Sequence, residues 1–236
     1  MKSLLLHPPR LPLIAPSVLS ADFARMGDEA AHVLASGADL LHLDVMDGHF
    51  VPNLTMGPDL CRCLREALPD VALDVHLMVE NPAQFVEPFA AAGATLLTFH
   101  VERLQGSSAV DLARRIRDRG MLAGLAVNPP TPVDPVLEIA SAFDLLLVMS
   151  VNPGFSGQAF MPGVLEKARR LRPMLRADQR LEVDGGVSPA TAGACREAGI
   201  DVLVAASAIF GKPRAERAGV IGALRGAESA GAPGIA

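Results

Sequence analysis

The fold of this chain is decided by the stretch His42-Leu43-Asp44-Val45-Met46-Asp47-Gly48, which follows the apolar pair Leu40-Leu41 and ends in an Asp-Gly turn signal. Side chains alternate between the two faces of a β-strand, so a strand here places His42, Asp44 and Met46 on one face. An imidazole and a carboxylate therefore point the same way, near the end where the strand stops.

Two later apolar runs carry a similar polar residue near their ends. His76 lies in Leu73-Asp74-Val75-His76-Leu77-Met78-Val79, and Asp184 lies in Leu181-Glu182-Val183-Asp184-Gly185-Gly186-Val187. Taken singly, each of these side chains is best interpreted as a hydrogen-bonded polar residue. As a set, two histidines and two carboxylates at strand ends predict a shared site around one divalent ion.

The rest of the chain alternates apolar strands with helical patterns. The predicted strands cover residues 13–19, 40–46, 72–79, 96–101, 121–127, 144–151, 181–187 and 202–206. The predicted helices cover residues 23–36, 58–68, 81–93, 107–119, 133–141, 162–175, 189–198 and 214–229. Near-continuous apolar strands are typical of a parallel sheet that is covered on both faces. Eight such units in 236 residues predict a single α/β domain, a closed (β/α)8 TIM barrel.

An open doubly wound sheet is the alternative architecture, but no G-x-G-x-x-G motif follows the first strand. We expect the barrel to span residues 13–229, after a loose Pro-rich leader at 1–12 and before a frayed tail at 230–236. In a barrel, the carboxyl ends of the strands carry the chemistry, and the four polar residues lie there.

The composition of the chain argues against several classes of function. Half of the residues are hydrophobic and the formal charge is -5, so the chain has no basic footprint for nucleic acid. Three cysteines make no disulfide framework, which favours a reduced compartment. The apolar start is too short for a secretory signal, and no run approaches the ~20 residues of a membrane span. We expect a soluble, cytoplasmic protein.

Buried carboxylates are costly unless they are paired or bind a metal. Imidazole and carboxylate together suit Zn²⁺, and also Mn²⁺, Fe²⁺ or Co²⁺. The loops after strands seven and eight of a barrel often bind phosphate through backbone N–H groups, and here they contain Gly185-Gly186 and Ala205-Ala206-Ser207. The neighbouring loop 152–158 has two further glycines, which favour additional amide donors or a lid over the site. The alternative is an ordinary mobile loop.

Three methionines, Met46, Met78 and Met149, fall near strand ends close to the predicted ion. Spacing alone favours core packing, because Met fills irregular gaps. The alternative is an apolar lid over the reacting carbons.

Five motifs together resemble the ribulose-phosphate 3-epimerase family. They are Pro16-Ser17-Val18-Leu19-Ser20-Ala21-Asp22-Phe23, the stretch from His42 to Asn53, Asp74-Val75-His76-Leu77-Met78-Val79, the stretch from Met149 to Gln158, and Val183-Asp184-Gly185-Gly186-Val187. The resemblance covers about residues 13–212 in the right order. It implies interconversion of D-ribulose 5-phosphate and D-xylulose 5-phosphate by an enzyme that is often a homo-oligomer, either a dimer or a hexamer.

The resemblance also implies roles for individual residues. It implies one divalent metal, usually zinc, held at the positions of His42, Asp44, His76 and Asp184, with Asp44 and Asp184 as the acid/base pair. The implied substrate contacts are Ser17, His76, Gly154, Phe155, Ser156, Gly157, Gly185, Gly186, Ala206 and Ser207. Ala206 departs from the family, which usually has Gly-Ser where this chain has Ala206-Ser207. Its methyl group adds bulk beside the expected phosphate, although the amide donor is kept.

Three other functions stay open at this point. One is 3-epimerisation of a hexulose 6-phosphate such as allulose 6-phosphate. Another is a lyase or decarboxylase on a phosphate-binding barrel, which typically needs a catalytic lysine at a strand end. Here the lysines are Lys2, Lys167 and Lys212, and none lies within a predicted strand. The last is a barrel that binds a phosphosugar without catalysis.

Overall fold

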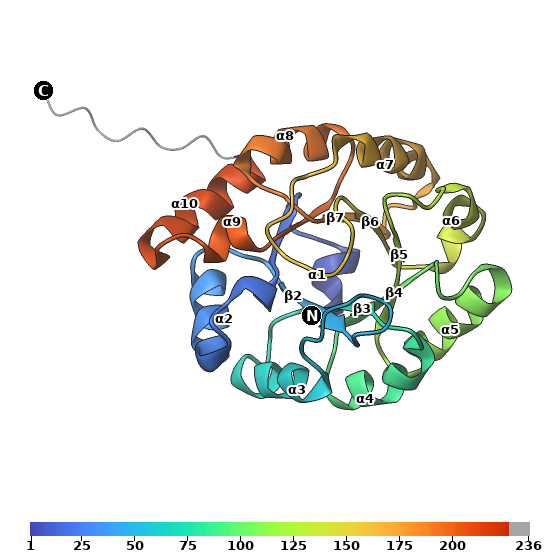
Figure 1. The fold of residues 1–236 in the computed structure, drawn as a ribbon, viewed down its shortest axis with the longest axis horizontal. Helices are drawn as coiled ribbons and strands as arrows, with labels where there is room; N and C mark the ends of the chain where they lie inside the picture. Colours follow the sequence, from blue (N-terminus) through green and yellow to red (C-terminus); the bar gives the residue numbers. More distant parts are fainter. Residues whose placement is uncertain (227–236) are drawn as a thin grey trace, which may run out of the picture.

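The structure is a computed structural model, and it describes residues 1–226. Eight parallel strands form a nearly closed barrel with helices around it, which confirms the predicted single-domain TIM barrel (Figure 1). The strands are β1 (Leu13–Pro16), β2 (Leu41–Met46), β3 (Leu73–Met78), β4 (Leu96–His100), β5 (Leu122–Val127), β6 (Leu145–Met149), β7 (Arg180–Asp184) and β8 (Val202–Ala205). Neighbouring strands pair from β2 through β8 to β1, and a parallel bridge between Ser17 and His42 joins β1 to β2.

Ten helices are found in the described residues. They are α1 (Lys2–Leu6), α2 (Met26–Ala35), α3 (Pro58–Ala67), α4 (Val86–Ala91), α5 (Gly106–Asp118), α6 (Asp134–Ile139), α7 (Leu165–Leu171), α8 (Pro189–Glu197), α9 (Ser207–Phe210) and α10 (Arg214–Arg225). Short 3-10 helices extend several of them, including Pro82–Phe85 before α4 and Arg172–Met174 after α7. Of the predicted helix at 214–229, α10 covers Arg214–Arg225, and Gly226 follows in a left-handed conformation with φ 94°. The last three residues of that prediction lie outside the described residues.

The residues of the barrel wall alternate between two cores. Outward-facing residues such as Leu43 and Val75 pack beneath the surrounding helices, in the larger hydrophobic cluster. Inward-facing residues such as Leu40, Leu96 and Leu145 fill the barrel interior. Every strand residue of β2 and β3 is buried, including the polar residues His42, Asp44, Asp74 and His76.

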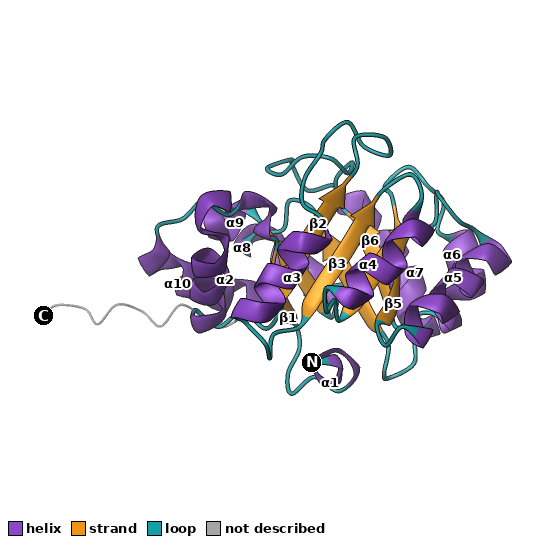
Figure 2. Ribbon diagram, turned by 90° about the horizontal axis from the view of Figure 1, so that it is seen from below, coloured by secondary structure: helices purple, strands orange, loops and turns teal. Residues whose placement is uncertain are grey.

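The leader is a point where the sequence-based expectation is wrong. Residues 1–12 are not loose, because Lys2–Leu6 form α1, which lies beneath the amino-terminal end of the barrel, opposite the loops at the strand ends (Figure 2). Leu5 is 2 % exposed and packs among the inner core residues. Arg180 fixes the helix by donating hydrogen bonds to the carbonyl oxygens of Leu5 (2.6 Å) and Leu6 (3.0 Å). The expected frayed tail at 230–236 lies outside the described residues.

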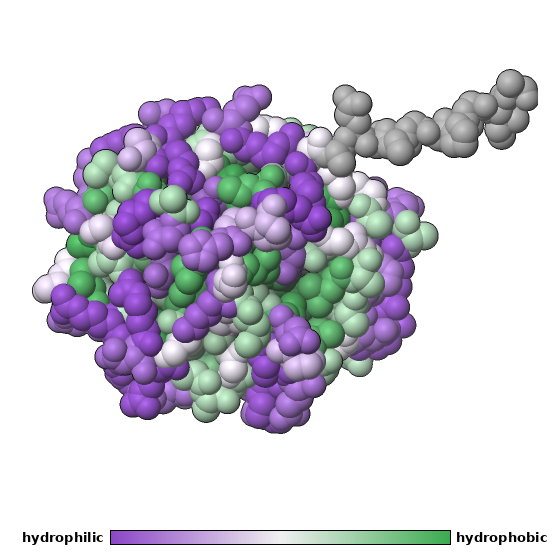
Figure 3. Space-filling view, turned by 180° about the vertical axis from the view of Figure 1, so that it is seen from behind, coloured by the Kyte–Doolittle hydropathy of each residue, from purple (hydrophilic) through white to green (hydrophobic). Residues whose placement is uncertain are grey.

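The opposite view shows the face behind that of Figure 1, where hydrophilic residues lie between hydrophobic ones and occupy much of the rim (Figure 3). Among residues 1–226, no helix combines the length and apolar character that crossing a membrane requires.

Candidate active site

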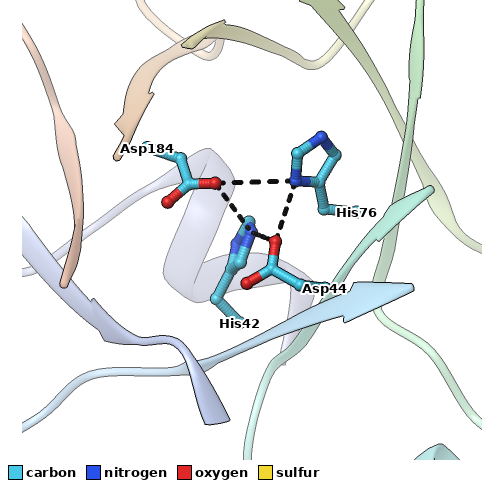
Figure 4. Close-up of side chains that lie close together, drawn as sticks. All are labelled: His42, Asp44, His76 and Asp184. Carbon is cyan, nitrogen blue, oxygen red and sulfur yellow. Dashed lines mark hydrogen bonds and ion pairs between the residues drawn. The ribbon is translucent and has the colours of Figure 1, made fainter. Parts of the chain in front are cut away.

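Strand alternation and parallel pairing bring the four predicted polar residues together. His42 and Asp44 point into the barrel from β2, and the register with β3 places His76 directly beside Asp44. Asp184 is the last residue of β7. Figure 4 shows the four side chains converging from three strands, with a nitrogen or oxygen of each directed toward the others.

The distances between the converging atoms suit a single ion. Asp44 Oδ1 lies 3.3 Å from His42 Nε2 and 3.1 Å from His76 Nδ1. Asp184 Oδ2 lies 4.0 Å from His42 Nε2 and 3.7 Å from His76 Nδ1. Metal–ligand bonds of about 2.0–2.2 Å place neighbouring ligand atoms of one ion roughly 3–3.5 Å apart, so small movements complete such a site.

A divalent cation fits these residues on further grounds. Within residues 1–226, His42 Nε2 is buried without a hydrogen-bond partner, and it points at the two carboxylates. Burial alone lowers the pKa of His42, but the negative charges of Asp74 and Asp44 outweigh burial and raise it. The cluster therefore attracts positive charge, and its two imidazole nitrogens and two carboxylate oxygens are suitable ligands for Zn²⁺ and similar ions.

The two carboxyl groups lie in unequal surroundings. Burial raises the pKa of Asp44, but the adjacent His42 and His76 outweigh burial and lower that pKa well below its ordinary value. Burial and the negative charge of Asp44 raise the pKa of Asp184 to about 7. Enzymes commonly use such unequal environments to give two carboxyl groups different roles.

Above these groups, the loops that follow β6, β7 and β8 enclose a pocket. Among its lining residues are Asp44, Asp184, Met46, Met78, Met149, Gly154, Phe155, Ser156, Gly157, Gly185, Gly186, Ala206 and Ser207. The structure thus brings most of the predicted site residues to one cavity. The three methionines are at most 3 % exposed and also line this pocket, so core packing and an apolar lid are not exclusive.

Glycines allow the pocket loops to approach each other closely. Gly186 has φ 64°, and a β-carbon there would lie 2.6 Å from the backbone nitrogen of Phe160. A β-carbon on Gly185 would lie 2.5 Å from a methyl group of Val151. The turn after β7 therefore packs against the loop after β6 as only glycine permits. From the loop after β2, Asn53 Nδ2 donates a 2.8 Å hydrogen bond to the carbonyl oxygen of Gly154, which lines the pocket.

Ala206 precedes the four-residue helix α9, which the sequence did not predict, and its backbone has φ -104° and ψ -93°. Its φ lies outside the left-handed region that favours glycine. The effect of its methyl group on phosphate affinity stays a prediction.

Three predicted site residues do not line the pocket. Ser17, His42 and His76 are buried below it. Ser17 Oγ donates a 2.5 Å hydrogen bond to Asp44 Oδ2. The substrate contacts predicted for Ser17 and His76 stay predictions. None of the lysines lines the pocket, and Lys167 Nζ instead donates hydrogen bonds to three backbone carbonyl oxygens of the loop after β5.

Sequence reasoning missed a layer of supporting residues inside the barrel. Asp74 Oδ2 accepts a 2.6 Å hydrogen bond from His42 Nδ1, and Glu182 Oε1 lies 3.8 Å from the same nitrogen. Burial and the charge of Asp74 raise the pKa of Glu182. His100 contacts His76, and Glu102 contacts His100. The alternation of side chains along a strand could have predicted Asp74 and Glu182. Each stands two residues before a predicted ligand and therefore lies on the same face of its strand.

Known proteins resemble this chain over most of its length. Residues 13–210 match the model of the ribulose-phosphate 3 epimerase family. The chain is 50% identical over 217 residues to a ribulose-phosphate 3-epimerase of Mycobacterium bovis, a match that covers 91% of this chain and 92% of that protein. It is 49% identical over 205 residues to the ribulose-phosphate 3-epimerase of Escherichia coli K12, covering 85% and 90% of the two chains.

Among solved structures, 3-keto-L-gulonate-6-phosphate decarboxylase from Vibrio cholerae is similar in fold, with a TM-score of 0.70 at 15% identity. That match covers 92% of this chain and 96% of the decarboxylase. At this identity the likeness concerns the barrel alone.

Proposed function

From its membership of the ribulose-phosphate 3-epimerase family, we propose that the chain interconverts D-ribulose 5-phosphate and D-xylulose 5-phosphate by inverting the configuration at C3. The observation that carries this proposal is the convergence of Asp44 and Asp184, from β2 and β7, on one point at the wall of a pocket with glycine-rich loops. Inverting a carbon next to a ketone requires removal of its proton from one face and delivery of a proton to the other.

Asp44 and Asp184 are proposed as the two acid/base groups. Asp44 accepts the C3 proton of ribulose 5-phosphate on one face, and Asp184 donates a proton on the other. The roles reverse for xylulose 5-phosphate. The hydrogen bond from Ser17 holds Asp44 Oδ2, so Oδ1 is the oxygen directed toward His76 and the centre of the cluster.

His42, Asp44, His76 and Asp184 would hold one divalent cation, with Zn²⁺ as the first choice and Fe²⁺, Mn²⁺ or Co²⁺ as alternatives. When bound, the cation supplies positive charge that stabilises the negative charge developing on the substrate as C3 loses its proton. The methionines line the same pocket and keep water from the reacting carbons.

The backbone N–H groups around Gly185-Gly186 and at the start of α9, after Ala206, are proposed to bind the phosphate. Phosphate binding far from C3 orients the sugar between the two carboxyl groups. A non-phosphorylated pentulose is therefore expected to be a poor substrate. The expected homo-oligomer and the cytoplasmic location also stay predictions.

The deciding experiment is a coupled assay of purified protein on ribulose 5-phosphate, allulose 6-phosphate and plain ribulose, with metal content measured in parallel. We expect turnover to be fastest with ribulose 5-phosphate and to fall after chelation. Asp44→Asn and Asp184→Asn should each remove nearly all turnover and slow the exchange of the C3 hydrogen with solvent deuterium.

Three results would count against the proposal. A near-wild-type rate in either Asp variant would refute the acid/base pair, faster turnover of allulose 6-phosphate would reassign the substrate, and binding without isomerisation by metal-loaded protein would favour a non-catalytic role.

A further inference from the structure

His76 has a second nitrogen, and its partner lies outside the four-residue cluster. Nδ1 of His76 faces Asp44 Oδ1 at 3.1 Å, whereas Nε2 lies 2.8 Å from Nε2 of His100. The two ring planes are 24° apart, and the centroids are 5.0 Å apart, much farther than the two nitrogens. The rings therefore meet edge to edge in nearly one plane, which suits an N–H···N hydrogen bond rather than stacking.

The contact continues from His100 to a carboxylate. His100 Nδ1 lies 3.1 Å from Glu102 Oε2, and Glu102 Oε1 accepts a 2.9 Å hydrogen bond from the backbone N–H of Asn128. Both histidines are fully buried, and the ring of Phe50 packs against His100 at a centroid distance of 4.8 Å. Water is thus kept from the nitrogens, and each must find its partner within this chain of groups.

These contacts leave one consistent placement of the protons. A neutral imidazole has one N–H donor and one acceptor nitrogen. When His76 Nδ1 presents its lone pair to the cluster, His76 carries its proton on Nε2 and donates it to His100 Nε2. His100 must then carry its proton on Nδ1, where it donates to Glu102. Every hydrogen bond in the series therefore runs from the cluster toward Glu102.

We propose that His100 and Glu102 are positioning residues, which fix the tautomer and orientation of His76 so that its Nδ1 serves as a cation ligand. The inference rests on the proposed cation site and extends it by two residues. Partners of this kind, beyond the ligands themselves, orient a metal-bound histidine and raise its basicity.

The other histidine has a shorter version of the same arrangement. His42 Nδ1 contacts Asp74 Oδ2 directly at 2.6 Å, and its Nε2 is the atom free to face the cluster. Each histidine is thus linked to a carboxylate: His42 contacts Asp74 directly, and His76 is linked to Glu102 through His100. The far end of the longer series is held in place by Lys167, which donates a 2.7 Å hydrogen bond to the carbonyl oxygen of Asn128.

Glu102→Gln is the sharpest substitution, because it keeps the size and shape of the side chain. Glu102 now accepts from two donors, one on each oxygen, whereas a Gln side chain has one acceptor oxygen. Its amide nitrogen must face either His100 Nδ1, which breaks the series, or the N–H of Asn128, which sets two donors against each other at the end of the series. Glu138→Gln, on the exposed face of α6, is the matched control.

The first test measures the dissociation constants of Zn²⁺ and Co²⁺ by chelator competition, together with the visible spectrum of the Co²⁺-loaded protein. Glu102→Gln should weaken both affinities about 10- to 100-fold and change the Co²⁺ spectrum, while E138Q leaves both unchanged. His100→Gln can still accept from His76 and donate to Glu102, so it should retain more affinity than His100→Leu. Wild-type affinity in the Glu102 variant would overturn the inference.

A second test uses only the wild-type protein, so it does not depend on whether a variant folds. Long-range ¹⁵N–¹H spectra of the Zn²⁺-loaded wild type report which ring nitrogen of each histidine carries the proton. We expect Nε2–H for His76 and Nδ1–H for His100, and the opposite tautomer of His100 would overturn the inference. Failure of the wild type to bind any divalent cation would instead count against the proposed cofactor, so the two failures are distinguishable.

Discussion

Ser17 donates a 2.5 Å hydrogen bond to Oδ2 of Asp44, and both residues are almost fully buried. A short O–H···O⁻ bond of this kind is charge-assisted and stronger than a neutral one. It occupies one carboxylate oxygen of Asp44 and leaves the other directed toward the two histidines.

Replacement of Ser17 by Ala should slow turnover more than it weakens substrate binding. It leaves Asp44 Oδ2 buried without its donor, a loss of about 1.5–3 kcal/mol for a bond to a charged group, or roughly 10- to 100-fold in kcat. Ser20→Ala is the control, because Ser20 Oγ is buried without a partner in residues 1–226. Steady-state kinetics of both variants decides the matter, and equal kcat values would refute the positioning role of Ser17.

Gly186→Ala should damage the phosphate end of the pocket. Its β-carbon would collide with the backbone of Phe160, and its φ of 64° disfavours a side chain. We expect KM for ribulose 5-phosphate to rise at least about tenfold, because the loop after β6 must move away. Gly120→Ala has a similar positive φ of 83° and open space around the β-carbon, and Gly120 does not line the pocket, so it tests backbone strain alone. A larger rise in KM for Gly120→Ala would contradict this explanation.

Glu29→Gln should destabilise the fold, whereas its neighbour Asp28→Asn should have little effect. Glu29 lies on α2 and is buried, and it forms ion pairs with two arginines of α10, Arg217 at 2.7 Å and Arg214 at 2.6 Å. Removing one partner of a buried ion pair leaves the other uncompensated, which costs about 3 kcal/mol in the free energy of unfolding. Asp28 also pairs with Arg214 but is exposed, where ion pairs contribute little.

The Glu29 effect should depend on pH in a defined direction. Burial raises the pKa of Glu29, but hydrogen bonds from Arg214 and Arg217 outweigh burial and lower it below 4.5. A carboxylate with a lowered folded-state pKa stabilises the fold above its unfolded pKa and loses that effect as pH falls. Urea unfolding should therefore show a difference between wild type and Glu29→Gln that is full at pH 7 and shrinks below about pH 4.5. A difference that grows on acidification would contradict the assignment.

The cysteines should differ sharply in reactivity. Burial raises the pKa of Cys61 to about 12 and that of Cys195 to about 11, so neither forms appreciable thiolate at pH 8. Cys63 is exposed. A thiol reagent at pH 8 should label one cysteine in the native protein and all three after denaturation, and Cys63→Ser should abolish the native reaction. Labelling of Cys61 in the folded state would refute its burial.

The sequence by itself determined the barrel and the four converging side chains. Apolar strands alternating with helices leave few ways to bury both faces of a parallel sheet, and all such strands end at the same rim. The period of two then fixes His42 and Asp44 on one face without any knowledge of neighbours. His76 and Asp184 follow, because each stands near the end of a strand of the same kind.

Only the tertiary structure decided which groups support that cluster. The contact of Ser17 with Asp44 and the series from His76 through His100 to Glu102 join strands or loops by distances that depend on strand register and barrel closure. Local sequence carries no measure of those distances. The same holds for α1. Its short apolar run does not show that Leu5 will be buried against the inner core of the barrel. Alternation along one strand is a local property, whereas contact between strands exists only once the barrel has closed.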